Sequence, residues 1–266
     1  MQPQRSTQSP DSAHSFRPTP GKAIQQVSFV DALVAGLFDG AFPASRVSAH
    51  GTLGVGCGDA LDGELVLLDG ALHVCRADGV SPVEPDARLP FAEVVDFAPT
   101  FHQQLSGPLS EADFEQLVDA LVPSHNLFYA IRLDGVFDSL TVREAQKQER
   151  RAAQAGESGQ QHPFPGLAEA VKSQHESTVG ETTGTLLGFK GPDVFQGLSV
   201  ADYHLHYLAD DKLFGGHSMD FQLRSGTLSI EAYSSFTVHL PDVDSYLDAE
   251  LDNVDADEAI RQAESQ

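Results

Sequence analysis

The sequence predicts an α+β protein in which β-sheet outweighs helix. Three observations carry this prediction: few segments have the apolar spacing of a helix, many alternate as strands do, and Asp-Gly turn residues separate some of the strands. From residue 182 onward nearly every segment alternates. Few helices and many strands, in mixed order along the chain, are typical of the α+β class.

Two segments combine helical periodicity with residues that begin and end helices. The first is expected to begin after Ser28 as N-cap and to run to Phe38. The second is expected to begin after Ser110 and to stop before Pro123, with an acidic residue in its first turn. A third, short helix is expected after Pro165.

Strands and hairpins account for most of the remaining pattern. Asp69-Gly70 separates apolar runs at residues 65–68 and 71–75, and this dipeptide tolerates the positive φ values of a tight hairpin turn. The same arrangement around Asp134-Gly135 predicts a second hairpin over residues 127–137. Further strands are expected at residues 185–189, 203–207, 218–223, 227–230 and 236–238.

Composition divides the chain into three regions. Residues 1–25 are rich in Ser, Pro and Gln and are expected to be a disordered tail. Residues 26–180 form an N-terminal mixed-sheet region, interrupted at about 144–163 by a polar insert that lacks a core-facing stripe; a flexible loop is expected there, with a solvated helix as the alternative. Residues 181–266 form a C-terminal antiparallel-sheet region that contains the histidines discussed below and ends in an acidic tail.

The chain is strongly acidic, with 39 acidic and 16 basic residues and a formal net charge of −23. Such a charge repels nucleic acids and anionic membranes, so neither is expected as a partner. No apolar run approaches the ~20 residues of a membrane span, and no secretory signal is evident, so a cytoplasmic protein is expected. Cys57 and Cys75 are too few for a disulfide framework, and two buried free thiols are expected.

Three histidines in the C-terminal region form the most informative motif. His204 and His206 are separated by one residue on a predicted strand, so they lie on one face, about 6.6 Å apart along the strand. His217 follows a stretch of turn residues and opens a strand that can return antiparallel to the first. Three converging imidazoles suit a tetrahedral zinc site with a position left open for substrate or water. The ordinary alternative is a group of polar side chains on a solvated sheet face.

Three further residues are candidates for chemistry. Glu64 follows a turn at the start of a strand, and Arg143 ends an alternating strand, where it could bind a carboxylate through two hydrogen bonds. Glu264 lies near the end of the acidic tail. Each also has an ordinary interpretation: an exposed edge carboxylate, a surface arginine and part of a solvated acidic end.

Taken together, several segments of the chain resemble the alpha-acetolactate decarboxylase family. The resemblance lies in their shared order and spacing and runs along most of the ordered chain. The segments that carry it are Ala60–Glu64, Arg76–Gly79, Asn126–Arg132, Thr185–Phe189, Tyr203–His206 and Phe214–His217.

The resemblance implies a curled mixed sheet toward the N-terminus, a largely antiparallel sheet toward the C-terminus, and a homodimer. It implies that His204, His206 and His217 bind Zn²⁺ in a carbon–carbon lyase that converts 2-acetolactate to acetoin and CO₂, in the acetoin and butanediol pathway. In this chemistry zinc chelates the hydroxyl and ketone oxygens of the substrate and stabilises the enediolate left when CO₂ departs, without an organic cofactor.

The resemblance also implies roles for the other three candidates. Glu64 and Arg143 are expected to line the pocket, and Glu264 to reach back to it from the tail. Arg143 would orient the leaving carboxylate or stabilise the developing oxyanion, and Glu64 or Glu264 would deliver the proton that makes acetoin chiral. Two features depart from the family: the insert after Arg143 is longer, and Cys57 stands where threonine is usual.

Two other functions are compatible with the histidine motif. A cupin-like metal barrel, acting as an oxygenase or isomerase, shares the strands, glycine turns and His-x-His. Its expected glutamate ligand, four residues after the second histidine, is Asp210 here. A non-enzymatic, metal-stabilised binding or storage protein would hold the metal with every coordination position filled and would turn over no keto acid.

Overall fold

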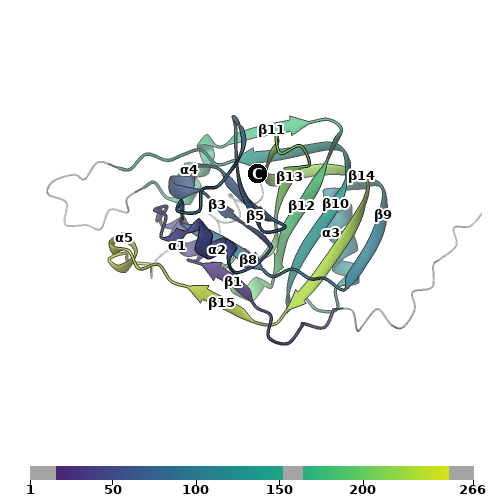
Figure 1. Cartoon of the computed structure of the whole chain (residues 1–266), viewed down its shortest axis with the longest axis horizontal. Helices are drawn as coiled ribbons and strands as arrows, with labels where there is room; N and C mark the ends of the chain where they lie inside the picture. Colours follow the sequence, from purple (N-terminus) through teal and green to yellow (C-terminus); the bar gives the residue numbers. More distant parts are fainter. Residues whose placement is uncertain (1–15, 152–163, 252–266) are drawn as a thin grey trace, which may run out of the picture.

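The computed structural model describes residues 16–151 and 164–251 and contains two main β-sheets (Figure 1). A seven-stranded sheet has the order β15-β1-β8-β3-β4-β5-β6, and a six-stranded sheet has the order β11-β10-β12-β13-β14-β9. The strands of the first are β1 (Ile24–Val27), β3 (Leu53–Cys57), β4 (Glu64–Leu68), β5 (Ala71–Arg76), β6 (Gly79–Pro82), β8 (Phe91–Val95) and β15 (Phe236–His239). Those of the second are β9 (Phe101–Ser110), β10 (Phe128–Glu144), β11 (His175–Val179), β12 (Thr182–Gly191), β13 (Asp202–Ala209) and β14 (Gly215–Tyr233).

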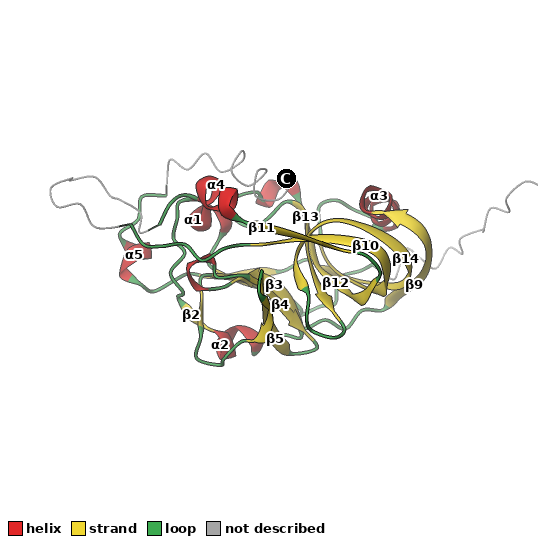
Figure 2. Cartoon of the chain, turned by 90° about the horizontal axis from the view of Figure 1, so that it is seen from above, coloured by secondary structure: helices red, strands yellow, loops and turns green. Residues whose placement is uncertain are grey.

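The helices are short and few, as the α+β prediction requires. They are α1 (Val30–Val34), α2 (Ala44–Ser48), α3 (Glu111–Leu121), α4 (Leu167–Ala170) and α5 (Asp244–Leu247), with 3₁₀ turns η2 (Asp59–Leu61), η3 (Val171–Ser173) and η4 (Asp193–Phe195). A two-stranded ribbon joins β2 (Phe42–Pro43) to β7 (Arg88–Leu89). Among the described residues, no helix has the length and apolar character needed to cross a membrane. Figure 2 shows α1, α2 and α4 at the end of the molecule that holds the first sheet, and α3 at the other end.

The character of each sheet confirms the predicted fold class. The first is mixed, because β15 runs parallel to β1 while β8, β3, β4, β5 and β6 pair antiparallel. The second is antiparallel throughout and curls on itself, because β10 pairs with both β12 and β14 while β13 joins β12 to the start of β14. A large apolar core fills the curl, and α3 packs against β9 and β14 beside it.

The two sheets do not divide at residue 180. β9, β10 and β11 precede that residue yet belong to the second sheet, and β15 follows it yet belongs to the first. The parallel pairing of Ile24 with Phe236 joins segments near the beginning and the end of the described residues. Such a pairing is set by packing rather than by a local turn, so no linker in the sequence marks the boundary.

Two predicted interruptions of strands are wrong. β10 is continuous from Phe128 to Glu144, so Asp134-Gly135 makes no hairpin. Gly135 instead lies opposite Gly184 on β12 and Gly226 on β14, and a Cβ at position 135 would lie 2.8 Å from the Ser225 carbonyl oxygen. The glycine therefore permits close approach of strands, which is the other common use of glycine in a sheet. β14 is likewise one strand over the two segments predicted at 218–223 and 227–230.

The predicted N-terminal boundaries are also wrong. Phe16 is buried and β1 begins at Ile24, so order starts before residue 25; residues 1–15 lie outside the described residues. Ser28 is not an N-cap, because its N–H extends the pairing of β1 by donating to the His239 carbonyl oxygen. The helix that follows covers only Val30–Val34, with Phe29 at the N-cap position.

Other local predictions are confirmed. Asp69 and Gly70 have φ values of 51° and 81°, as a hairpin turn between β4 and β5 requires. The Ser110 hydroxyl accepts a hydrogen bond from the Asp113 N–H at 3.2 Å, which caps α3. α4 follows Pro165, and Cys57 and Cys75 are buried free thiols.

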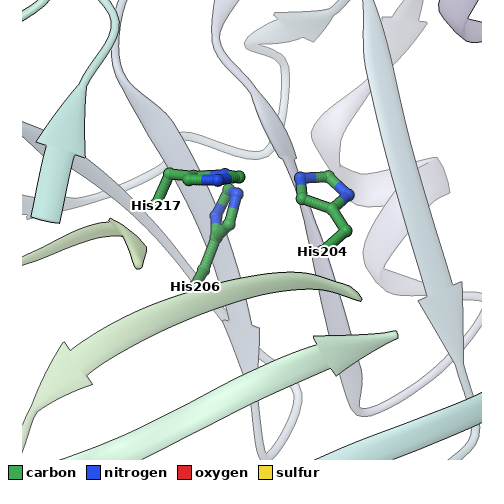
Figure 3. A group of neighbouring side chains, drawn as sticks. All are labelled: His204, His206 and His217. Carbon is green, nitrogen blue, oxygen red and sulfur yellow. The ribbon is translucent and has the colours of Figure 1, made fainter. Parts of the chain in front are cut away.

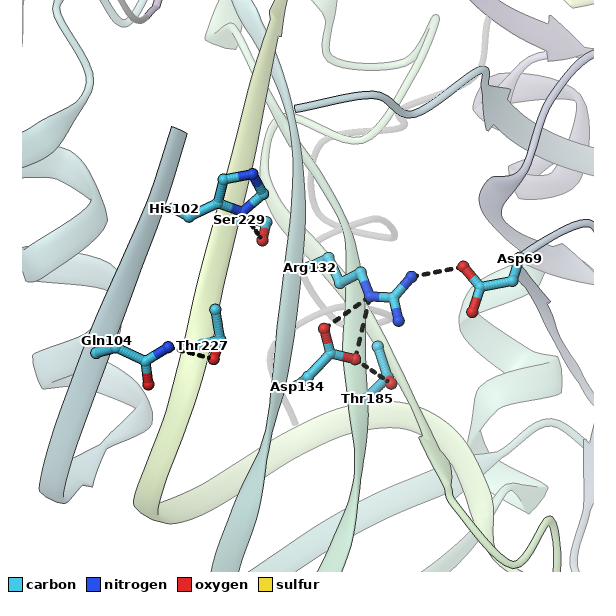
Figure 4. A network of polar contacts seen from close by, with 8 residues as sticks. All are labelled: Asp69, His102, Gln104, Arg132, Asp134, Thr185, Thr227 and Ser229. Carbon is cyan, nitrogen blue, oxygen red and sulfur yellow. Dashed lines mark hydrogen bonds and ion pairs between the residues drawn. The ribbon is translucent and has the colours of Figure 1, made fainter. Parts of the chain in front are cut away.

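A polar network connects the tip of the β4–β5 hairpin to the second sheet (Figure 4). Arg132 on β10 forms ion pairs with Asp69 at 2.6 Å and with Asp134 at 2.8 Å, and Thr185 on β12 donates to Asp134 at 2.8 Å. Beside this network, apolar side chains of both sheets share one core that includes Val55, Val66, Leu187 and Leu208. The two sheets are therefore held at one relative position by apolar packing and by this polar contact at its edge.

A buried polar pair lies within the first sheet. Gln26 on β1 and Glu93 on β8 are directly opposite each other, and both are buried. Ser199 Oγ donates to one Glu93 oxygen at 3.4 Å, and the other oxygen and Gln26 Oε1 have no hydrogen-bond partner among the described residues. Burial raises the pKa of Glu93 to about 8. We infer that Glu93 keeps its proton in the folded protein. The protonated Glu93 oxygen can then act as a donor, and Gln26 Oε1 is an acceptor in need of one.

The pH dependence of folding tests this inference. The pKa of Glu93 is about 8 in the folded protein and has the ordinary value of 4.5 in the unfolded chain. Between these two pH values the folded protein therefore keeps a proton that the unfolded chain releases. Glu93 therefore makes stability fall as pH rises, by about 2–3 kcal/mol between pH ~6 and ~8. Urea unfolding should show this loss in the wild type and lack it in Glu93→Gln. The exposed Glu84→Gln is the matched control, and equal pH dependence in all three proteins would contradict the inference.

Candidate metal centre and active-site pocket

The three histidines lie together at the junction of the two sheets, as Figure 3 shows. His204 and His206 point from one face of β13, and His217, near the start of β14, lies directly opposite His206. One nitrogen of each ring lies within 4.8 Å of the others, and all three residues are buried. The alternative of polar side chains on a solvated face is therefore wrong, and the predicted convergence is confirmed.

Burial also determines the charge state of these rings. It holds the pKa of His206 and His217 well below the ordinary value of 6.5, with further lowering from nearby Arg143 and the neighbouring histidines. Both imidazoles are therefore neutral near pH 7, which is the form that binds metal ions.

A contact with the first sheet orients His206. Its Nδ1 lies 2.8 Å from the Leu65 carbonyl oxygen, which can only accept, so Nδ1 carries the proton and Nε2 has a free lone pair. Nε2 is buried without a hydrogen bond to any described residue. A carbonyl that fixes the tautomer of a histidine in this way is the usual support of a metal ligand. The donor set thus fits a metal ion.

Arg143 extends the same row of side chains. On β10 it lies directly opposite His217, so Arg143, His217 and His206 occupy one cross-strand line over β10, β14 and β13. Only 4% of the Arg143 surface is exposed, which contradicts the interpretation of a surface arginine. A buried guanidinium beside neutral histidines makes this end of the site electropositive, and such a group suits a carboxylate ligand.

Glu64 approaches from the first sheet. It begins β4, and its Oε2 lies 3.7 Å from His206 Nε2, while its Oε1 accepts a hydrogen bond from the Ala145 N–H at 3.2 Å. Its side chain is only 12% exposed, so it is not an exposed edge carboxylate. Cys57 and Cys75 are its cross-strand neighbours, and burial raises the pKa of both thiols, which therefore stay uncharged.

A pocket joins several of these groups. Glu64, Arg143, His204 and His217 form its polar end. Its remaining wall is mostly apolar and comes from α1, the α4–η3 segment, the first sheet, η2 and the loop before β13, through Val30, Leu33, Cys57, Leu61, Phe91, Leu167, Ala170, Val171 and Val200. A mostly apolar pocket with a few converging polar groups is typical of a small-molecule site.

The structure also brings in residues that sequence reasoning did not single out. Ala145, Gln146 and Gln148 belong to the predicted flexible insert, yet they line the pocket. Periodicity could not reveal them, because the insert attaches through backbone hydrogen bonds rather than through an apolar stripe. Residues 152–163, the rest of the insert, and Glu264 lie outside the described residues.

The cupin-like hypothesis lacks its fourth ligand. Asp210 is exposed, and the metal-ligand cluster found among residues 16–151 and 164–251 consists of the three histidines. The Asp210 N–H donates to the Thr183 carbonyl oxygen at the end of the β12–β13 pairing, which places this residue in the following turn.

Comparison with known proteins identifies a family with similar sequences. The family model for alpha-acetolactate decarboxylase matches residues 24–253. The alpha-acetolactate decarboxylase of Methylococcus capsulatus is 38% identical over 243 residues, covering 91% of this chain and 88% of its own. That of Bacillus subtilis is 34% identical over 237 residues, covering 89% of this chain and 88% of its own.

Solved structures show the same fold. The crystal structure of alpha-acetolactate decarboxylase from Bacillus subtilis superposes with a TM-score of 0.84 at 32% identity, covering 92% of this chain and all 100% of its own. A Staphylococcus aureus protein described as similar to alpha-acetolactate decarboxylase superposes with a TM-score of 0.82 at 27% identity. The match covers 91% of this chain and 100% of that protein's chain. Fold and pocket thus define an enzyme of the decarboxylating lyase class. The chain belongs to the alpha-acetolactate decarboxylase family.

Metal binding can be tested on the histidine cluster directly. Protein stripped with a chelator should bind a single Zn²⁺ ion per chain in a calorimetric titration. His206→Ala removes one proposed ligand and its contact to Leu65, so the affinity for Zn²⁺ should fall by at least about 100-fold. This is more than the fall in affinity expected when a residue that only supports a ligand is lost. The exposed His175→Ala is the matched control and should bind as the wild type does. Unchanged affinity in His206→Ala would show that the ion binds elsewhere.

Proposed function

We propose that this protein converts 2-acetolactate to acetoin and CO₂ and that its metal ion is Zn²⁺, held by His204, His206 and His217. The observation that carries the proposal is the row of Arg143, His217 and His206, with the Glu64 carboxylate 3.7 Å from His206 Nε2. This row would offer a site for a carboxylate beside a site for a metal, as a small keto acid requires.

The chemistry of the donor set favours zinc. Three neutral imidazoles suit Zn²⁺, and they leave it the full positive charge and open coordination positions. When bound, the ion supplies a Lewis acid for the hydroxyl and ketone oxygens of the substrate. No organic cofactor is then required to accept the electron pair released with CO₂.

Arg143 is proposed to bind the carboxylate that leaves as CO₂. The guanidinium is buried and stays charged, so a bidentate hydrogen-bonded pair with the carboxylate would be strong and well oriented. Orientation matters here, because the breaking C–C bond must align with the π system of the neighbouring ketone. As CO₂ departs, the same positive charge would stabilise the negative charge that develops on the oxygens.

Glu64 is proposed to deliver the proton that replaces CO₂ on carbon. Its carboxyl group is held at Oε1 by the Ala145 N–H, and Oε2 faces the histidine cluster. A donor on one side of a planar intermediate protonates one face, so the acetoin formed would be chiral. Glu264 remains the alternative donor proposed for the tail.

The apolar wall would contribute in a different way. Side chains such as Leu33, Phe91 and Leu167 line the site, and substrate bound against them would leave less room for water. Exclusion of water strengthens the electrostatic contribution of Arg143 and prevents protonation of the intermediate from bulk solvent. We also propose a homodimer that supplies the acetoin and butanediol pathway, and sedimentation velocity would test the dimer.

Turnover in the presence and absence of metal is the first test. Metal-loaded protein incubated with racemic 2-acetolactate should form acetoin, should stop on chelation, and should recover when Zn²⁺ is returned. The reason is that the histidine cluster alone, without an ion, offers no group that accepts the electron pair. A folded, zinc-loaded sample that forms no acetoin would overturn the proposal.

Substitution of the polar groups tests their separate roles. Glu64→Gln keeps an acceptor for the Ala145 N–H but cannot donate a proton, so kcat should fall by about 10²–10⁴-fold with little change in KM. Arg143→Lys keeps the charge but loses the bidentate geometry, so kcat/KM should fall by roughly 10–100-fold. Glu84→Gln, far from the pocket, is the control. If Glu264→Gln alone abolishes stereospecific protonation, Glu264 rather than Glu64 is the donor.

A further inference from the structure

The segment Ala145–Arg151, here called the strap, leaves the end of β10 two residues after Arg143 and runs along the pocket. It has no regular secondary structure, yet it is tied to the first sheet by backbone hydrogen bonds. The Gly63 N–H donates to the Ala145 carbonyl oxygen at 3.2 Å, and the Gln148 N–H donates to the Ala60 carbonyl oxygen at 2.7 Å. The strap therefore pairs with the turn that precedes Glu64.

That turn has an unfavourable backbone. Ala60 and Leu61 have φ values of 55° and 58°, and Gly63 follows with a φ of 90°. Non-glycine residues in the left-handed region cost of order 1–3 kcal/mol each and persist only where surrounding contacts hold them. The Ala60 N–H donates to the Phe38 carbonyl oxygen at 2.8 Å, and its carbonyl accepts from Gln148 on the other side. The Gln148 N–H thus makes one of the two backbone hydrogen bonds that hold this turn at Ala60.

The strap also contacts the carboxylate itself. The Ala145 N–H donates to Glu64 Oε1 at 3.2 Å. Because the same residue accepts from Gly63, Ala145 links the turn, the start of β4 and the Glu64 side chain in one short cycle of hydrogen bonds. A small displacement of the strap would therefore change where the Glu64 carboxyl group points.

The Gln148 side chain connects the strap to the helical wall of the pocket. Its Nε2 donates to the Gln146 carbonyl oxygen at 2.7 Å and lies 3.4 Å from Ser173 Oγ, which in turn donates to the Ala170 carbonyl oxygen at 2.9 Å. Gln148 thus makes backbone and side-chain contacts in opposite directions, to the turn and to η3.

Ion pairs hold the far end of the strap. Arg150 pairs with Asp39 and lies over the Phe164 ring at 5.4 Å, and Arg151 pairs with Glu169 on α4 at 3.0 Å. The Arg151 pair is exposed on both sides and Arg150 is exposed although Asp39 is half-buried, and ion pairs open to solvent contribute little. The half-buried Gln148 is therefore the better candidate for the residue on which the position of the strap depends.

We propose that Gln148 is a positioning residue for Glu64, acting through the strap and its Ala145 N–H. The inference rests on the proposed function, in which Glu64 delivers the proton to carbon. Loss of the Gln148 side chain frees the strap from η3, and the Glu64 carboxyl group loses its fixed direction. Substrate binding through Arg143 is untouched, so the effect falls on kcat rather than on KM.

Kinetics of Gln148→Ala provide the first measurement. We expect kcat to fall about 5–20-fold with KM changed less than about twofold, because misplacement of a reacting group by a fraction of an ångström to 1 Å costs up to ~10²-fold. The acetoin formed should become less enantiomerically pure, since solvent competes with a misdirected donor. Lys147→Ala, an exposed neighbour on the same strap, is the matched control and should keep the wild-type kcat and product ratio.

A double-mutant cycle with Glu64→Gln separates positioning from direct contact with the substrate. If Gln148 acts through Glu64, adding Gln148→Ala to Glu64→Gln should lower kcat by less than about twofold more. The same 5–20-fold loss in both backgrounds would overturn the proposal, as would an unchanged kcat and product ratio in Gln148→Ala.

Crystal structures supply a readout that does not depend on turnover. In Gln148→Ala the distance from Ala145 N to Glu64 Oε1 should exceed hydrogen-bonding range, whereas in Lys147→Ala it should match the wild type. An unchanged distance in Gln148→Ala would overturn the positioning role even if the protein is active. A wild-type protein that forms no acetoin would instead remove the proposed function, so the two failures are distinguishable.

Discussion

The orientation of the metal ligands depends on a contact between the two sheets, the hydrogen bond from His206 Nδ1 to the Leu65 carbonyl oxygen. His206 lies on β13 of the second sheet, and Leu65 lies on β4 of the first, next to Glu64. This bond fixes the tautomer of a buried imidazole and sets the distance between the histidines and the carboxylate. The shared apolar core brings the two sheets together, and this bond sets the orientation of the His206 ring relative to Glu64.

The burial that makes the site also determines its chemistry. His206 and His217 are neutral because charge is costly inside the protein, and the same burial makes Arg143 a strong partner for an anion. Cys57 and Cys75 flank Glu64 as uncharged thiols, so among the cross-strand neighbours of Glu64 none adds a negative charge. A single pocket thus combines neutral metal ligands, one fixed cation and one carboxyl group.

Local patterns predicted local structure well. The β4–β5 hairpin and the Ser110 cap depend on contacts within a few residues, and both are confirmed. Asp134-Gly135 was misleading, because the same dipeptide serves a turn in an isolated hairpin and a close approach of strands in a curled sheet. The insert was misleading for another reason: the strap is held by backbone hydrogen bonds, which leave no trace in side-chain periodicity.

The sequence by itself determined the class of fold, the three histidines and their presence on neighbouring strands, because the period of a strand and a glycine turn are local properties. The family resemblance extended this to Glu64 and Arg143. Only the tertiary structure decided that β15 returns to β1, that Arg143 lies opposite His217, and that the strap reaches Glu64. These contacts join residues far apart in the chain, and their energies arise from packing and from hydrogen bonds that exist only after the sheets have met.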